Sequence, residues 1–236
     1  MDCAKRGSMF VPYGIDHWDM ANLAAGGLPA GAAYGRAPFG LLEIDDLQKG
    51  LRLNSIAMPF VALPGGDTFG AIRHHMTSLL SPWDGTARRV LSAYFDWVDE
   101  LVESRREVLD TKIAPYGGLF SYADFRFSAP MPLVRAHLLA PSPQGKRGDA
   151  GDFFRADIAF FPGDSRIVAF VSDNETPRSR RQRDERLNAA GIAVRSIESF
   201  LSGTSTRFIE ALCPNGPDRF WEDEIMPCGP FQPFVG

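Results

Sequence analysis

Carboxylate side chains recur at the ends of two apolar segments in the second half of this 236-residue chain. Asp157 interrupts the apolar run 153–161, and Asp173 and Glu175 lie at the end of the largely apolar segment 166–175. Clustered carboxylates repel one another, so a buried group of them needs protons or a cation to neutralise it. An all-oxygen ligand set suits Mg²⁺ or Mn²⁺, which can activate water and offset the charge that develops on a phosphodiester. The leading hypothesis is therefore metal-dependent hydrolysis of a nucleic-acid backbone.

The two apolar segments are expected to pair as a β-hairpin through the Pro-Gly-Asp-Ser turn at 162–165. Because side chains alternate along a strand, Asp157 is the one carboxylate within an otherwise apolar strand, and Asp173 and Glu175 point to one side. Pairing through this turn would bring Asp157 beside Asp173. The three catalytic candidates, Asp157, Asp173 and Glu175, would then share one small volume.

A helix is predicted over 176–190, with Thr176 as its cap, Pro177 at its first position and Gly191 just past its end. Its arginines offer bidentate contacts to phosphate. The predicted nucleic-acid-binding residues are Arg178, Arg180, Arg181 and Arg183. The simpler alternative is a solvated helix face whose arginines pair with neighbouring carboxylates.

A second helix is predicted from Ser81, which could cap it ahead of Pro82. Apolar residues at spacings of three and four form one buried stripe: Val90, Leu91, Tyr94, Trp97, Val98, Leu101, Val108 and Leu109. Acidic residues follow the same spacing on another face, where solvation is the default interpretation. The sharper hypothesis is that Glu103 approaches the hairpin and shares a metal ion with Asp157 and Asp173.

The order of these elements resembles the restriction-endonuclease-like superfamily, known by its PD-(D/E)xK motif. The segments RADIAFF, RIVAFVSDN and RRQRDERLNAAGIAVRSI look most similar to the branch that includes very-short-patch-repair-type endonucleases, and the resemblance spans roughly 81–200. It implies an α/β fold, with a mixed central sheet flanked by helices, and Mg²⁺-dependent endonuclease activity on DNA. Literal transfer of the motif makes Asp157 and Asp173 metal ligands and puts Glu175 in the lysine position, while Ala156 replaces the proline.

A second register of the same motif also fits, because these strands commonly end in Glu-x-Asp-Gly. Asp173 and Asn174 then occupy the Asp-Gly place, and Val171 stands where the glutamate belongs. The site would have lost a ligand, and the protein would be a catalytically degenerate nuclease fold that serves as a nucleic-acid-binding or protein-assembly module. A third reading is an enzyme that handles phosphate on a small molecule.

Three regions are expected: an irregular N-terminal extension over 1–80, the endonuclease-like core over 81–205, and a C-terminal helix end with a Pro- and aromatic-rich tail over 206–236. The extension or the tail aromatics (Phe220, Trp221, Phe231 and Phe234) could dock a protein partner. A net charge of −4 argues against nucleic-acid binding by the whole surface. No apolar run reaches the roughly 20 residues of a membrane helix, and no signal peptide is recognised, so we expect a cytoplasmic protein without membrane contact.

Overall fold

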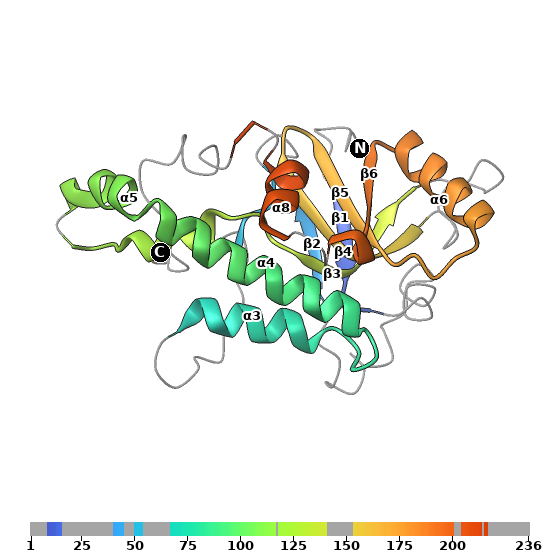
Figure 1. Cartoon of the computed structure of the whole chain (residues 1–236), viewed down its shortest axis with the longest axis horizontal. Helices are drawn as coiled ribbons and strands as arrows, with labels where there is room; N and C mark the ends of the chain where they lie inside the picture. Colours follow the sequence, from blue (N-terminus) through green and yellow to red (C-terminus); the bar gives the residue numbers. More distant parts are fainter. Residues whose placement is uncertain are drawn as a thin grey trace, which may run out of the picture.

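The computed structural model shows an α/β arrangement in which helices pack on a mixed β-sheet (Figure 1). The residues that it describes are 9–15, 40–44, 50–53, 67–116, 118–140, 153–200, 204–213 and 215–216. The predicted tail aromatics and most of the predicted N-terminal extension lie outside these residues.

The main sheet has four strands in the order β3-β4-β5-β6. Their bounds are β3 Leu133–Leu139, β4 Phe153–Gly163, β5 Arg166–Val171 and β6 Ile192–Ser196. β4 pairs antiparallel with both β3 and β5, whereas β6 pairs parallel with β5 across a helical connection. The predicted mixed sheet flanked by helices is confirmed.

The β4–β5 hairpin forms where the turn residues predict it. Asp164 and Ser165 both have φ of 55°, the left-handed pair that a two-residue type I′ turn requires. This turn matches the right-handed twist of the strands, and a register shift between Phe160 and Gly163 accommodates the end of the hairpin. The hairpin fixes which residues of β5 face Asp157.

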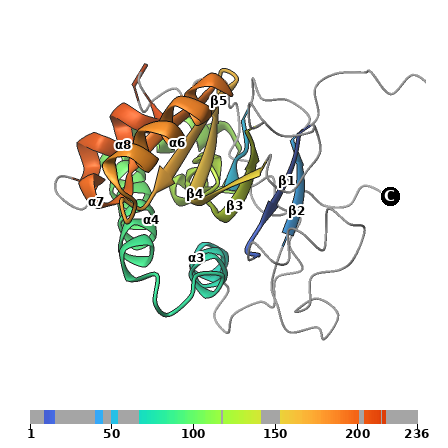
Figure 2. The ribbon, with the colours of Figure 1, turned by 90° about the vertical axis from the view of Figure 1, so that its right-hand side faces the viewer.

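A second, two-stranded sheet is formed by β1 (Met9–Tyr13) and β2 (Gly40–Ile44), which pair antiparallel. It lies beside β3 (Figure 2), and the Gly14 N–H donates to the Val134 carbonyl at 2.9 Å. Residues 50–53 attach to the main sheet as well, because the Leu51 N–H donates to the Phe161 carbonyl at 2.8 Å. Val11, Tyr13, Leu51 and Leu53 of the predicted extension therefore belong to the main core.

The helices are α3 Thr68–Ser78, α4 Gly85–Ser104, α5 Arg106–Ile113, α6 Pro177–Ala189, α7 Ile197–Phe200 and α8 Thr204–Leu212, with 3₁₀ turns η2 Ala114–Tyr116 and η3 Tyr122–Ser128. The predicted helix from Ser81 begins instead at Gly85, because the Asp84 carboxylate accepts the Ser81 N–H at 2.9 Å and holds 81–84 in a turn. The helix also breaks at Arg105. Val108, predicted in the buried stripe, is consequently exposed on α5.

The segment 122–128, which precedes strand β3, forms the 3₁₀ helix η3. Ser121 and Asp124 form a capping box in which the Asp124 carboxylate accepts the Ser121 N–H at 2.7 Å. Such local side-chain bonds offer the backbone an alternative to a strand ladder.

Helix α6 forms where it is predicted, one residue shorter at each end than 176–190, since local chemistry sets both of its ends. The Thr176 hydroxyl accepts the Ser179 N–H at 3.3 Å, and Pro177 occupies the first turn. Gly191, with φ of +77°, supplies the left-handed residue that follows a helix. The chain then enters β6.

The core is centred on aromatic rings that join α4, the sheet and α8. Tyr94 on α4 contacts Phe160 on β4 and Phe208 on α8, and Phe170 on β5 contacts the same two phenylalanines. All four side chains are fully buried. Among the described residues, no helix is both long and apolar enough to cross a membrane.

Candidate functional site

Asp157 lies near the middle of β4, on the face of the sheet opposite to the aromatic core. Ile158 pairs with Phe170 on β5, and neighbouring strand residues alternate between faces. One residue earlier, Asp157 therefore stands opposite Val171. Ser172 donates both its backbone N–H and its hydroxyl to Oδ2 of Asp157, each at 2.7 Å. This carboxylate is tied to the end of β5 by hydrogen bonds that need no ion.

The register decides what lies beside Asp157 on the neighbouring strand. Directly opposite is the apolar side chain of Val171, and Asp173 follows two residues later, beyond the end of β5. A metal ion bound by Asp157 would find a valine at the adjacent position of β5. The register thus matches the second reading of the motif, in which Val171 replaces a carboxylate.

Asp173 is held by α6 and by β6. Arg180 Nε lies 3.3 Å from Asp173 Oδ1, Arg183 Nη2 lies 3.9 Å from the same oxygen, and the Ser196 hydroxyl donates to Oδ2. The Asp173 N–H in turn donates to Glu198 Oε2 at 3.0 Å. Guanidinium and hydroxyl groups therefore occupy both oxygens of the predicted second metal ligand.

Glu175 is also matched by an arginine, and that arginine is buried. Arg183 Nη1 lies 3.4 Å from Glu175 Oε2 and donates to the Ser172 carbonyl at 3.2 Å, while Nε donates to Asp184 Oδ1 at 2.9 Å. The Arg183 side chain is only 6% exposed. It joins α6 to the end of β5 and supplies charge that clustered carboxylates would otherwise need from a cation.

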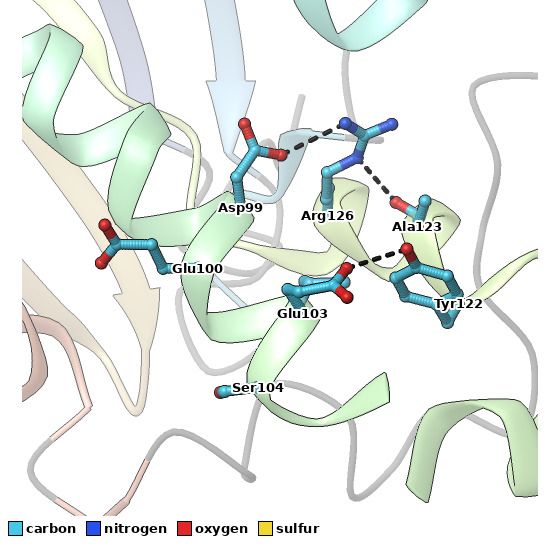
Figure 3. Close-up of a pocket in the computed structure, with 8 residues that line it drawn as sticks. Asp99, Glu100, Glu103, Ser104, Tyr122, Ala123 and Arg126 are labelled. Atoms are coloured by element: carbon cyan, nitrogen blue, oxygen red, sulfur yellow. Dashed lines mark hydrogen bonds and ion pairs between the residues drawn. The ribbon is translucent and has the colours of Figure 1, made fainter. Parts of the chain in front are cut away.

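Glu103, the third predicted metal ligand, lies elsewhere. It belongs to the end of α4 that leads into α5, away from α6 (Figure 1). Its Oε2 accepts the Tyr122 hydroxyl at 2.8 Å, in a pocket of about 610 Å³ between α4 and η3 (Figure 3). The pocket lining is Asp99, Glu100, Val102, Glu103, Ser104, Tyr122, Ala123 and Arg126. The structure does not bring Glu103 to the hairpin.

These positions do not fit the predicted metal centre. Throughout the part of the chain that the structure describes, no three histidine, cysteine, aspartate or glutamate side chains are grouped so that they could hold a metal ion. Asp157 and Asp173 are near the same end of the hairpin, but each is engaged by donors of the protein. Arginine side chains supply the positive charge next to Asp173 and Glu175.

The arginines of α6 divide into two rows, because residues three and seven apart share a helix face. Arg180 and Arg183 face the carboxylates, followed by the buried Leu187. Arg178 and Arg181 lie on the other side, exposed to solvent. Arg181 is 82% exposed and pairs only with Glu185, at 2.9 Å. Of the four predicted nucleic-acid-binding residues, two are therefore presented outward and two are turned towards the sheet.

Two further arginines lie on the Asp157 face, and the sequence analysis did not single them out as site residues. Val134 pairs with Ile158 and Ala136 with Ala156, which places Arg135 of β3 opposite Asp157. Arg155 precedes Asp157 by two residues on β4. For Arg155 the signal was in the sequence, since it keeps the two-residue period of Asp157 on the same strand.

Two other reactive side chains are buried away from solvent. Burial raises the pKa of Cys213 to about 12, so this thiol remains protonated and is a poor nucleophile. His137 is buried, with Nε2 3.1 Å from the Ile15 carbonyl. Neither side chain adds a nucleophile or a general base to the Asp157 face.

Comparison of the chain with protein-family models, with curated proteins and with solved structures finds no match.

Proposed function

We propose that the protein is a restriction-endonuclease-like module that binds the phosphate backbone of nucleic acid, DNA in the first instance, without metal-dependent hydrolysis. The observation that carries this proposal is that arginine side chains, rather than a metal ion, neutralise the candidate carboxylates. Arg180 and Arg183 neutralise Asp173 and Glu175, and the position opposite Asp157 is Val171. The order α4, β3, β4, β5, α6 and β6 supports the likeness to the endonuclease fold.

The outward row of α6 supplies the proposed contact with nucleic acid. Arg178 and Arg181 are exposed, and the pair between Arg181 and Glu185 is a surface ion pair, which contributes little. A phosphate can therefore displace Glu185 without a large cost. Binding of this kind is local, which is compatible with a net charge of −4.

Substitution of both Arg178 and Arg181 by alanine is expected to weaken binding of a fluorescent DNA duplex to a similar extent for unrelated sequences. The salt dependence should also become shallower, by about two in the slope of log K against log salt, because two phosphate contacts are removed. Fluorescence anisotropy at several salt concentrations measures both quantities. The exposed Arg89 on α4 provides the control, and an equal loss in Arg89→Ala would rule out α6 as the binding surface.

Metal-dependent hydrolysis is the second candidate, favoured by the nearness of Asp157 to the end of β5. If this candidate is correct, the wild type cleaves DNA in a reaction stimulated by Mg²⁺ or Mn²⁺, and Asp157→Ala abolishes the cleavage. The binding proposal expects the same assay to show no metal-stimulated cleavage by the wild type. Metal-stimulated cleavage that is lost in this variant would replace the first proposal with the second.

A further inference from the structure

We propose that Trp83 is a stacking platform for an unpaired base of the nucleic acid. It lies in the turn between α3 and α4, separate from the outward row of α6. The inference rests on the proposed function, because it names a part of the nucleic acid that α6 does not hold. It narrows the ligand from any phosphate backbone to DNA that carries a single-stranded segment.

The Trp83 side chain extends almost wholly into solvent. Its exposed fraction is 92%, and the other exposed large hydrophobic residues of the described chain are aliphatic and less exposed: Val108, Leu119 and Leu139. Neither face of the indole is therefore covered. A tryptophan has a large apolar surface, and burial of that surface against a ligand contributes strongly to binding.

Hydrogen bonds fix the backbone that carries the indole. The Ser81 hydroxyl accepts the Trp83 N–H at 3.3 Å, and the Ser81 carbonyl accepts the Asp84 N–H at 3.0 Å. Arg88, in the first turns of α4, donates to the carbonyls of Leu80 and Ser81 at 2.5 Å and 3.0 Å. A binding group on a fixed backbone loses less conformational entropy when its ligand arrives. The turn therefore presents the ring before any ligand binds.

The turn lies on the same side of the molecule as α6. In Figure 1 the ends of α3 and α4 that it joins lie on the right, below α6, and Figure 2 views that side. A duplex held by Arg178 and Arg181 can thus direct a single strand towards Trp83. Val108, by contrast, belongs to α5, at the opposite end of the molecule (Figure 1).

The surroundings of the ring favour a flat, uncharged group. The charges of Asp84 and Arg88, which both bond to the turn, cancel each other. A tryptophan that anchors a protein partner is normally surrounded by further contacts, but residues 81–86 contain no second large hydrophobic side chain. An isolated ring with open faces matches a nucleobase, which stacks through its π-face whatever its sequence. Bases within a duplex are already stacked on their neighbours, so an unpaired base is the occupant.

Fluorescence anisotropy with two overhangs of equal charge tests the stacking contact. One DNA duplex carries a short thymidine overhang, and the other carries the same overhang built from abasic nucleotides. The wild type is expected to bind the thymidine overhang about tenfold more tightly, since a stacked base contributes on this order. Trp83→Ala should bind both with equal affinity. Leu119→Ala is the matched control, because Leu119 is 80% exposed and apolar, and it should keep the tenfold difference.

Trp83→Phe separates stacking from other roles of the side chain. Phenylalanine keeps an aromatic face, so this variant should recover most of the preference that Trp83→Ala loses. A single-stranded thymidine oligonucleotide should quench the tryptophan fluorescence of the wild type but not that of Trp83→Phe. Quenching that persists in this variant would show that another tryptophan contacts the base and would overturn the inference. Both variants should keep the wild-type thermal midpoint, because the residue is exposed.

Failure of this inference and failure of the proposed function give different results. Duplex binding that depends on Arg178 and Arg181, with equal affinity for the thymidine and abasic overhangs, keeps the proposed function and rejects Trp83 as a stacking platform. Quenching by the oligonucleotide that is lost in Trp83→Phe, without binding of a blunt duplex, keeps the stacking site and rejects the backbone-binding module. A wild type that binds none of these DNAs would reject both.

Discussion

Replacement of the buried Arg183 by alanine is expected to lower the free energy of unfolding by about 2–4 kcal/mol. Arg183 donates to the Ser172 carbonyl and pairs with Glu175 and Asp184, so its removal leaves several acceptors without their donor. Asp173 would also lose one of its two arginines. Because these carboxylates are partly exposed, water compensates for some of the loss, which places the value below that of a fully buried pair.

Urea unfolding of purified protein measures this effect, and Arg181→Ala is the control. Arg181 belongs to the same helix but is 82% exposed, so its loss should cost less than about 0.5 kcal/mol. Arg183→Lys should fall between the two, because lysine keeps the charge but not the planar fork. Equal midpoints for Arg183→Ala and Arg181→Ala would show that Arg183 does not hold α6 to β5.

The elements that the sequence predicts best are those whose ends are set by local chemistry. Thr176, Pro177 and Gly191 set the ends of α6 through bonds and backbone preferences within a few residues. The hairpin turn is likewise local. Helix α3 was not recognised, because its N-terminal Asp67 follows a run of glycines and prolines that masks the start signal, although its carboxylate accepts the Gly70 N–H at 2.9 Å.

The site was less predictable, because its charge balance depends on contacts between elements. The spacing of Asp157 and Asp173 indicates convergence, but it does not show that arginines from the next helix will reach Asp173 first. A signal was available in the spacing of Arg180, Arg183 and Leu187. These residues share one face of α6, and a buried leucine in that row indicates that the arginines before it also face inward.

The spacing of residues in the sequence also did not decide between the two registers of the motif. Both registers contain Asp157, and they differ in whether Val171 or Asp173 is its partner on β5. The turn geometry resolves the pairing: because Ile158 stands opposite Phe170, the direct neighbour of Asp157 is Val171. Val171 and Asp173 are two residues apart, so the alternation of side chains does not distinguish them, and the pairing set by the hairpin is what puts Val171 opposite Asp157.

Gly50→Ala is expected to lower the free energy of unfolding by about 2–5 kcal/mol, the sum of backbone strain and steric overlap. Gly50 has φ of +71°, and a Cβ atom there would lie 2.3 Å from the Phe161 carbonyl oxygen and 2.4 Å from the Gly163 nitrogen. Both contacts are to backbone of the β4–β5 hairpin, which cannot move aside as a flexible side chain would. Residue 50 therefore packs directly on the backbone of the β4–β5 hairpin, at a position where only glycine fits.

Gly191→Ala separates the two contributions, since Gly191 has φ of +77° and no atom within 4 Å of an added Cβ. This control carries the strain alone and should cost about 1–2 kcal/mol. The difference between the two variants in urea unfolding then measures the overlap at the hairpin. If both variants lose the same free energy, the backbone of 50–53 does not pack closely on β4, and the described residues before α3 would have to be treated as a separate attachment to the sheet.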